Sequence, residues 1–448
     1  MERQYKISGL KWIGKIPETW KVDRFKNKFK TGKGLNITKG DLVQEGIPVV
    51  SYGQVHSKQN TGTHLDDFLI RYIPSRLAEE GVSSKVSVGD LIFADTSEDI
   101  VGCGNAVYVD REIGLYAGYH TVIAFAKNPE ESKYFAYLFL TDCWRSQIRM
   151  RVTGIKVFSI SQAILNESTV IYPHKVEQKR IVDFLDEKCK EIDSLIALQE
   201  TMIEKLKVYK QSVITEAVTK GLDPNAKLIP SGIDWIGEIP EGWEVKPFKV
   251  VFRTGSGLSF TKADLVKEGI PVISYGQVHS KQNKGTYIDD VLVRFVPAEI
   301  TKGGETSKVN VGDFIFADTS EDLDGCGNCV YINKEIGLYA GYHSVIAFSK
   351  RHESNAYLAY LFLTDCWRYQ IRCRVSGIKV FSISQSIIKQ TSVILPPKEE
   401  QHDIASYLDE KCADIDRLVE MKQKKIEKLK EYKKSVIFEA VTGKTKIE

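Results

Sequence analysis

The sequence has no run of about 18 consecutive apolar residues, the length that a membrane-spanning helix needs, so we expect no membrane span. Its start, MERQYKISGLKWIGK, lacks the apolar stretch of a secretory signal. The chain contains eight cysteines in 448 residues, far below the density of a disulfide scaffold. Together these absences predict a cytoplasmic protein that does not meet a membrane.

The sequence also lacks a strong excess of charge of one sign. It has 62 Lys and Arg against 59 Asp and Glu, a formal net charge of +3, which alone does not indicate nucleic acid as a partner. The balance of 42% hydrophobic and 27% charged residues is typical of a folded chain. The length fits two or three domains.

Sequence motifs of catalysis are missing. We find no glycine-rich cofactor loop with an Asn-Pro-Pro-aromatic or Pro-Cys active site, no nucleophile elbow and no His-Glu-x-x-His pair. Gly443-Lys444-Thr445 resembles the end of a P-loop, but Phe438 stands where the first glycine is required. We therefore predict that the chain is not an enzyme and holds no cofactor and no metal of its own.

The dominant feature is an internal repeat with an offset of 223 residues. Residues 8–219 align with residues 231–442 without a gap, at about 135 identities in 212 positions. SYGQVHSKQN at 51–60 returns unchanged at 274–283, and GLYAGYH at 114–120 returns at 337–343. Because solenoid repeats are about 20–50 residues long, this repeat predicts two copies of a domain instead.

Within each copy the pattern changes once. The first 172 residues carry short β-type segments separated by glycine and polar turns, and one helix-like stretch at 134–150. The β-type segments are 47–52, 90–94, 105–110 and 121–126. This texture predicts a mixed α/β (α+β) globular domain whose loops carry function.

From about residue 176 to 219 the pattern becomes that of one long helix. Apolar residues recur every seven positions, with Gln199 as a polar member and Leu195, Met202 and Tyr209 on a second track. The second copy repeats the pattern from 399 to 442. One such seam could pack on its own domain, but two equal seams predict an antiparallel helix pair that sets the distance between the domains. The residues expected to pair are Leu185, Ile192, Leu195, Leu206, Val213, Leu408, Ile415, Leu418, Leu429 and Val436.

Polar and aromatic loops that occur in both copies are the candidate recognition surface. Their Gln, Asn, Lys, Ser and Thr side chains are types that hydrogen-bond base edges or phosphates. A solvated loop is the plainer interpretation of any single residue, but the unchanged ten-residue segment favours function, because 68–80 and 291–303 have diverged. The candidate DNA-binding residues are Tyr52, Gln54, His56, Ser57, Lys58, Gln59, Asn60, Thr96, Ser97, Tyr119, His120 and Lys156, with Tyr275, Gln277, His279, Ser280, Lys281, Gln282, Asn283, Thr319, Ser320, Tyr342, His343 and Lys379.

Two residue groups resemble metal ligands. Cys326-Gly-Asn-Cys329 is a single CxxC, and zinc is disfavoured because Ala106 replaces the second cysteine in the first copy. The carboxylate pairs Glu98/Asp99 and Glu321/Asp322 adjoin glycine-rich turns, where solvated side chains are the plainer interpretation.

Longer motifs carry a family resemblance. They are GIDWIGEIPEGWEV at 232–245, echoed from Gly9, and PHKVEQKRIVDFLDEKCKEIDSLI at 173–196 followed by EKLKVYKQSVITEAVTKG at 204–221. The second copy reads PPKEEQHDIASYLDEKCADIDRLV at 396–419 and EKLKEYKKSVIFEAVTGK at 427–444. With these motifs the chain resembles the specificity subunit of a type I restriction–modification system over essentially its whole length.

The resemblance implies two target recognition domains held apart by paired long helices about a pseudo-twofold repeat. It implies recognition domains at 1–172 and 223–395 and helices at 173–222 and 396–448. The implied partners are double-stranded DNA, two modification (methyltransferase) subunits and two restriction subunits, with S-adenosylmethionine, ATP and Mg on those subunits and none on this chain. The chain itself would choose the sequence and be catalytically silent.

The near identity of the two copies departs from the family's usual pattern of two dissimilar recognition domains. Two like domains about a pseudo-twofold axis predict an interrupted palindrome as the target, as for dimeric DNA readers. The alternative from another class is a coiled-coil interaction or structural module without sequence-specific DNA binding. The two differ in salt dependence, because a DNA reader loses affinity steeply with salt while keeping sequence preference.

Overall fold

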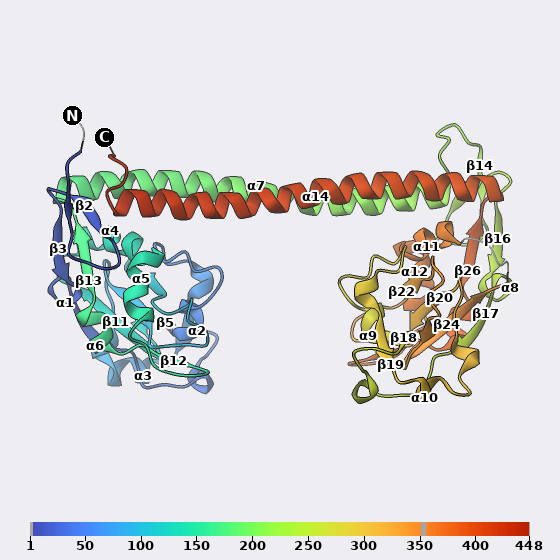
Figure 1. The fold of residues 1–448 in the computed structure, drawn as a ribbon, viewed down its shortest axis with the longest axis horizontal. Coiled ribbons are helices and arrows are strands. Elements are labelled where there is room, and N and C mark those ends of the chain that lie inside the picture. The colour runs from blue at the N-terminus through green and yellow to red at the C-terminus, as the bar shows by residue number, and fades with distance from the viewer. Residues whose placement is uncertain (1–2, 351–354, 448) are drawn as a thin grey trace. The chain divides into compact units, whose positions relative to one another are not determined.

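The computed structural model describes residues 3–350 and 355–447, and the chain divides into two compact units (Figure 1). Unit 1 comprises Met1–Glu200 with Lys424–Glu448, and unit 2 comprises Thr201–Gln423. Each unit contains one globular domain and a part of each of the two long helices. Both domains mix helices and strands, which confirms the predicted α+β class. In the described parts of the chain no helix is long and apolar enough to cross a membrane.

The centre of the unit 1 domain is an antiparallel sheet in the order β4-β11-β7-β9. Its central strands are continuously apolar because both faces are covered, which is typical of a buried strand. Val122 of β11 lies opposite Lys33 on one side and Phe93 on the other. The bounds are β4 Phe29–Lys33, β7 Leu91–Ala94, β9 Ala106–Tyr108 and β11 Thr121–Ala126.

A second, three-stranded sheet and short ladders complete the unit 1 strands. In the order β10-β5-β6 the first pair is parallel and the second antiparallel. The ladders pair β1 with β2, β3 with β13 and β8 with β12. The bounds are β1 Tyr5–Ile7, β2 Lys15–Pro17, β3 Lys21–Arg24, β5 Ile47–Val50, β6 Arg71–Ile73, β8 Thr96–Ser97, β10 Tyr116–Ala117, β12 Phe158–Ser159 and β13 Thr169–Tyr172.

Two helices replace the single helix-like stretch expected at 134–150. They are α4, Pro129–Phe139, and α5, Asp142–Arg149. The break falls at Thr141, whose side chain accepts a hydrogen bond from the backbone N–H of Trp144 and so caps a new helix. The expectation of one helix was wrong because the apolar pattern continues across this cap. The shorter helices are α1 Phe25–Lys28, α2 Tyr52–Val55, α3 Ser75–Glu80 and α6 Gln162–Glu167.

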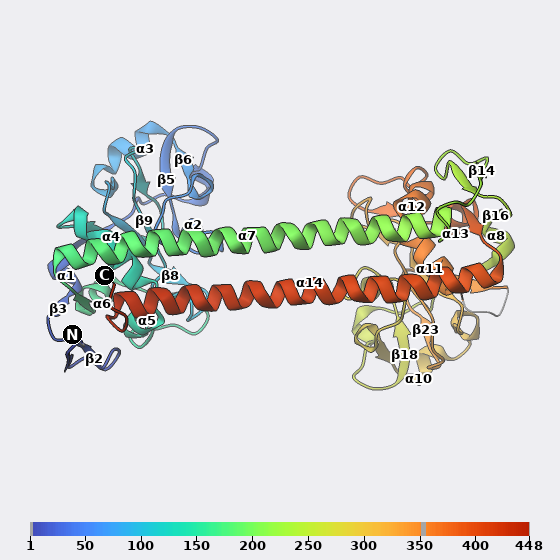
Figure 2. The same cartoon turned by 90° about the horizontal axis from the view of Figure 1, so that it is seen from above.

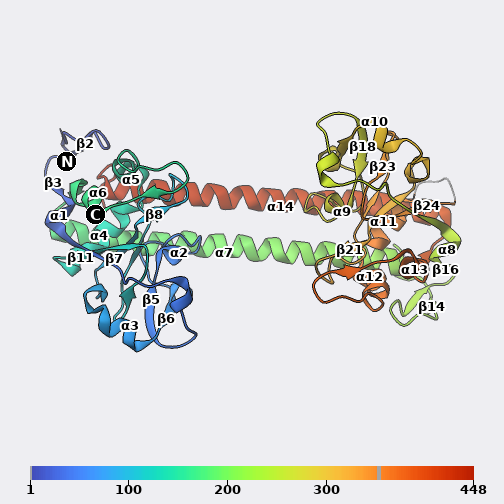
Figure 3. The same ribbon diagram turned by 90° about the horizontal axis from the view of Figure 1, so that it is seen from below.

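The unit 2 domain repeats this arrangement, with sheets β17-β24-β20-β22 and β19-β18-β23. Figure 3 shows β18 and β23 beside α10 in this unit. Its strands are β14 Leu228–Pro230, β15 Glu238–Pro240, β16 Glu244–Pro247, β17 Phe252–Ser256, β18 Ile270–Ile273, β19 Arg294–Val296, β20 Phe314–Ala317, β21 Thr319–Ser320, β22 Cys329–Tyr331, β23 Tyr339–Ala340, β24 Ser344–Ser349, β25 Phe381–Ser382 and β26 Ser392–Leu395. Its helices are α8 Phe248–Val251, α9 Tyr275–Val278, α10 Ala298–Thr301, α11 Ala356–Phe362, α12 Asp365–Arg372 and α13 Gln385–Lys389.

Aromatic residues fill the main core of each domain. In unit 1 the rings of Phe139 and Trp144 lie 4.1 Å apart, and Phe25 packs beside both. In unit 2 the equivalent rings of Phe362 and Trp367 lie 4.2 Å apart. The helices α4 and α5 lie between the strands of unit 1 and the long helices (Figure 1), so this core joins the sheet to the helix pair.

The two long helices are α7, Lys175–Lys220, and α14, Lys398–Val441. Neither contains proline or glycine, which would interrupt the backbone hydrogen bonds or loosen the helix. Gly221 ends α7 with a φ of 77°, a conformation that glycine adopts without strain.

The helices pair antiparallel within each unit. In unit 1, Leu185 of α7 shares a buried cluster with Ile437 and Val441 of α14, and Asp193 further along α7 binds Lys433. In Figure 2 the C-terminal end of α14 accordingly lies beside the first part of α7. In unit 2, Lys210 of α7 binds Asp416. The long paired helices of the predicted fold are therefore present, and their ends also pack on the domains.

Part of the predicted seam is wrong. Leu195 and Leu418 are 44% and 45% exposed, and Met202 and Tyr209 of the same track are exposed as well. The buried second track of α7 lies one residue further along and contains Cys189 and Ile203. Sequence reasoning missed it because Lys210 also falls on this track and lowers its apolar character. The other predicted residues are buried or half-buried: Leu185, Ile192, Leu206, Val213, Leu408, Ile415, Leu429 and Val436.

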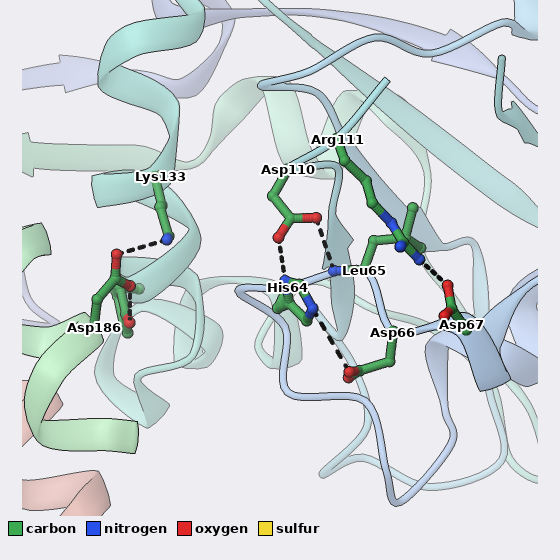
Figure 4. Close-up of polar contacts among 9 residues, drawn as sticks. His64, Leu65, Asp66, Asp67, Asp110, Arg111, Lys133 and Asp186 are labelled. Atoms are coloured by element: carbon green, nitrogen blue, oxygen red, sulfur yellow. Dashed lines mark hydrogen bonds and ion pairs between the residues drawn. The ribbon is translucent and has the colours of Figure 1, made fainter. Parts of the chain in front are cut away.

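An aspartate of the long helix ties each domain to it. Asp186 of α7 accepts hydrogen bonds from Lys133 and Tyr137, both at 2.6 Å (Figure 4). In unit 2 the equivalent Asp409 of α14 accepts from Tyr287 and from Tyr360, the latter at 2.5 Å. Burial raises the pKa of Tyr137, which keeps its hydroxyl protonated and donating.

The same view shows a second polar cluster at the edge of the unit 1 domain. The carboxylate of Asp110 binds the His64 ring and accepts from the backbone N–H of Leu65 at 3.2 Å, while Arg111 binds Asp67 (Figure 4). These bonds fix the segment that follows the 51–60 loop.

Candidate nucleic-acid interface

Each domain contains a polar cavity that is built from the predicted recognition segments. The cavity in unit 1 has a volume of about 680 Å³, and that in unit 2 of about 840 Å³. Each is lined by thirteen residues, and every lining residue of the second cavity is the 223-residue equivalent of one in the first. Of the predicted candidates, Tyr52, His56, Thr96, Ser97 and His120 line the first cavity, and Tyr275, His279, Thr319, Ser320 and His343 line the second.

A histidine in each cavity connects other lining residues by hydrogen bonds. His56 Nε2 lies 2.7 Å from the Thr96 carbonyl oxygen, and its Nδ1 lies 3.2 Å from the side-chain amide of Asn105. Because a carbonyl can only accept, Nε2 donates and Nδ1 accepts from Asn105, the pattern of a neutral imidazole. His279 repeats this with Thr319, at 2.7 Å, and Asn328, at 3.3 Å.

A half-buried arginine completes this network. Arg145 donates to Asn105 Oδ1 at 2.7 Å and to the Phe139 carbonyl at 2.8 Å. Burial lowers the pKa of Arg145 to about 10, so the guanidinium stays charged at neutral pH. Arg368 in unit 2 donates to the Phe362 carbonyl at 2.9 Å, and burial lowers its pKa as well. Arg145 and Asn105 are residues that sequence reasoning missed, although both sit in segments repeated without change.

Aromatic rings form the rim. Tyr52 lies edge-on to Tyr119 at 5.6 Å and to His120 at 5.5 Å between centroids. In unit 2, Tyr275 lies 5.7 Å from Tyr342 and 5.5 Å from His343. These faces and edges are suited to contact with planar groups such as bases.

The rim histidines have an unusual backbone. His120 and His343 have φ values of 53° and 52° and are, in the described part of the chain, the only non-glycine residues with positive φ. Such backbone conformations are held against a cost and cluster at functional sites. Asp95 and Asp318 lie beside these histidines, each with Oδ1 3.3 Å from Nδ1, and both histidines line their cavities.

Several of the predicted DNA-binding residues make hydrogen bonds within their own domain. Gln54 Oε1 accepts from the backbone N–H of Ser51, which caps α2, and Asn60 donates to two backbone carbonyls at 2.8 and 2.9 Å. Ser57 Oγ accepts from the backbone N–H of Gln59, and Ser97 donates to the Asp99 carbonyl. In unit 2, Gln277, Asn283, Ser280 and Ser320 make the same bonds.

The remaining candidates face solvent. Lys58, Gln59 and Lys156 are exposed, as are Lys281, Gln282 and Lys379. Tyr119 and Tyr342 are half-buried, and burial raises the pKa of both. The site therefore combines an aromatic-rimmed cavity with exposed cations beside it, an arrangement that can read a base edge and hold a phosphate.

The residues that resembled metal ligands have other contacts. Cys326 and Cys329 are buried, and Asp99 Oδ1 accepts from the backbone N–H of Gly102 at 2.6 Å. Across the described residues no group of three or more His, Cys, Asp or Glu side chains is placed to hold a metal ion.

Comparison with known proteins identifies this architecture. The family model "Type I restriction modification DNA specificity domain" matches residues 17–208 and again residues 240–431. The two matches are offset by the same 223 residues as the repeat and together cover most of the chain. The chain belongs to this specificity-domain family. It is thus a type I restriction–modification specificity subunit with DNA target recognition domains.

Individual relatives agree. The chain is 22% identical over 453 residues to the type I restriction enzyme EcoKI specificity subunit of Escherichia coli (strain K12), covering 96% of this chain and 90% of that one. It is 24% identical over 306 residues to the MjaVIII specificity subunit of Methanocaldococcus jannaschii, covering 68% of each.

Solved structures share the fold. The HsdS subunit from Thermoanaerobacter tengcongensis aligns with a TM-score of 0.51 at 15% identity, covering 96% of this chain and 98% of that one. A chain from work on complex assembly and conformational transition of the type I R-M system aligns with a TM-score of 0.68 at 15% identity, covering 96% and 99%.

Proposed function

We propose that this subunit directs a type I restriction–modification complex to a bipartite target, and that the target is an interrupted palindrome. The observation that carries the proposal is the equivalence of the two cavities. Of their thirteen lining positions only one differs, Val101 against Asp324. Two domains with the same reading surface, related by a twofold operation, read the same half-site on opposite strands.

The spacer between the half-sites follows from the helices in this proposal. The helices α7 and α14 span 46 and 44 residues without interruption, about 65–70 Å each at 1.5 Å per residue. A helix pair of fixed length gives an unread DNA segment of fixed length.

We also propose that modification and restriction subunits bind to this chain. Exposed apolar side chains on the long helices support a protein interface, because they lie outside the seam. They include Leu195 and Leu198 in unit 1 and the equivalent residues Leu418 and Met421 in unit 2. Exposed apolar residues that repeat along one helix face are typical of a docking surface. In this proposal S-adenosylmethionine, ATP and Mg belong to the partner subunits, and this chain alone neither methylates nor cuts DNA.

Long-read methylome sequencing tests the proposed target. Cells that express this chain with its modification subunit should carry methylated adenines in a short motif, a spacer of constant length and the reverse complement of that motif. A motif with two unrelated halves would contradict the palindrome while leaving sequence specificity intact. Purified chain without partners supplies the control, since methylation or cleavage by it alone would contradict the non-catalytic role.

A further inference from the structure

An isoleucine on a tight loop beside each cavity is more exposed than any other large apolar side chain in the described residues. Ile155 is 97% exposed and Ile378 is 99% exposed. Burying an isoleucine stabilises a fold, so an isoleucine left in water does not make that contribution. A single exposed apolar residue is ordinary, but the same residue at full exposure in both copies is not.

The loop is rigid and bound to the recognition surface. The Ser159 backbone N–H donates to the Thr153 carbonyl at 3.1 Å and closes the loop, and β12 pairs with β8, where Phe158 lies opposite Ser97 and Ser159 opposite Thr96. A side chain at Gly154 would lie 1.9 Å from the Val157 carbonyl oxygen, so only glycine permits this turn. The loop therefore holds Ile155 in one place relative to the cavity, which Val157 itself lines.

The two copies keep this loop unchanged while its surroundings differ. Residues 154–162 are identical to residues 377–385, whereas Val101 on the cavity wall is replaced by Asp324. The other exposed large apolar side chain of this loop is a valine, Val157 in the first copy and Val380 in the second, each 51% exposed. Both domains thus share a fully exposed β-branched isoleucine with an exposed lysine next to it, Lys156 or Lys379.

From these observations we infer that Ile155 and Ile378 are wedges that insert between adjacent base pairs of double-stranded DNA at the edge of each half-site. Apolar side chains inserted between base steps unstack and kink the duplex, and the adjacent cations hold the displaced phosphates. The neighbouring lysine supplies that cation here. The wedge would unstack the base-pair step next to the half-site before the modification subunit acts on the DNA. This inference rests on the proposed function.

Fluorescence of 2-aminopurine tests the wedge, because this base brightens when it loses its stacking partner. The complex with the modification subunit is bound to duplexes that carry its mapped motif, with 2-aminopurine placed at successive positions other than the methylated adenine. We expect a several-fold rise at one step beside each half-site. Ile155→Ala should abolish the rise at one half-site and Ile378→Ala at the other, with about tenfold weaker binding for each, since the wedge's apolar burial is lost. Ile155→Leu should keep both the fluorescence rise and the wild-type affinity.

Val82→Ala is the matched control, because Val82 is 64% exposed and its equivalent is Glu305, so no shared role exists to remove. A rise that is absent in the wild-type complex, or that survives Ile155→Ala, would overturn the wedge. Loss of co-purification with the modification subunit in Ile155→Ala would also overturn the wedge and assign the loop to protein contact. Failure of the proposed function is distinct, since the wild-type complex would then show no sequence preference at all.

Discussion

Lys433 of α14 places its Nζ 2.7 Å from Oδ2 of Asp193 on α7. The equivalents of these two residues in the other copy form the same ion pair. Lys210 corresponds to Lys433 and Asp416 to Asp193, and Lys210 Nζ lies 2.7 Å from Asp416 Oδ1. Each helix thus supplies the lysine of one ion pair and the aspartate of the other. The same lysine–aspartate ion pair therefore joins the two helices once in each unit.

Charge reversal tests this ion pair. Asp193→Lys should destabilise the chain by about 1 kcal/mol, since Asp193 is half exposed and such pairs are screened by solvent, and adding Lys433→Asp should restore most of the loss. Urea unfolding of the single and double variants measures the coupling. Lys179, which pairs with Asp183 within α7, is the control, because reversing it leaves the contact between helices intact. Equal effects of both reversals would contradict a role in helix pairing.

A fragment of residues 1–220 should form a dimer. In unit 1 the buried cluster includes Ile437, Ala440 and Val441 of α14, whose equivalents on α7 are Ile214, Ala217 and Val218. A second copy of the fragment can therefore supply the same side chains to that cluster. Sedimentation or light scattering should give twice the fragment mass. A monomer at micromolar concentration would contradict the prediction, and Ile214→Asp should prevent dimerisation.

His120→Gly should change DNA sequence recognition while leaving the stability of the chain almost unchanged. Glycine adopts the φ of 53° without strain but costs chain entropy, so we expect stability within about 1 kcal/mol of the wild type. The imidazole at the cavity rim is lost, so one half of the methylated motif should become degenerate. His343→Gly should relax the other half, and the double variant both. Unchanged motifs in methylome sequencing would show that these histidines do not contact DNA.

Lys58→Ala should weaken DNA binding equally for all sequences. An exposed lysine beside the cavity is suited to a phosphate contact, and removing one such contact lowers the slope of log K against log salt by about 1. Binding titrations of the complex at several salt concentrations measure the slope. Lys188→Ala is the control, because that lysine pairs with Glu191 on α7. A changed motif with an unchanged slope would assign Lys58 to base reading instead.

Thiol labelling should follow burial. Burial raises the pKa of Cys329 to about 12 and that of Cys189 to about 11, so near pH 8 roughly one thiol in a thousand or fewer is the reactive thiolate. Cys373 is exposed, so it should react first with iodoacetamide in peptide mapping by mass spectrometry. Raising the pH toward 11 should increase labelling of Cys189 before Cys329. Rapid native-state labelling of Cys329 at pH 8 would contradict its burial.

The repeat and the seven-residue pattern were sufficient to predict two mixed domains and long paired helices, because apolar periodicity reports helices directly. The position of the second seam track was not predictable. Cys189 and Lys210 weaken the apolar pattern on the true track, whereas Leu195 strengthens the track that the structure leaves exposed. Packing of both helices on the domains decides which face is buried, and that packing depends on residues distant in sequence.

The sequence was sufficient to predict the loops of the candidate site but not the hydrogen-bond network that joins them. Tyr52, His56 and His120 were recognisable because their segments are repeated and polar. Asn105 and Arg145 were not, because one lies in a glycine turn and the other in a helix, and only folding brings them to His56. Gln54 and Asn60 illustrate the converse, since their amides satisfy backbone groups of their own loop.

The single difference between the cavities has an evolutionary consequence. A protein assembled from two separate identical chains must change both reading surfaces at once, whereas here each domain is encoded independently. Asp324 places a carboxylate on a wall that is apolar at Val101. A carboxylate accepts hydrogen bonds from the amino group of cytosine, which valine cannot do. If the target is the interrupted palindrome proposed above, the flank of its second half-site is the position at which the symmetry would first be lost, one substitution at a time and with the rest of the assembly untouched.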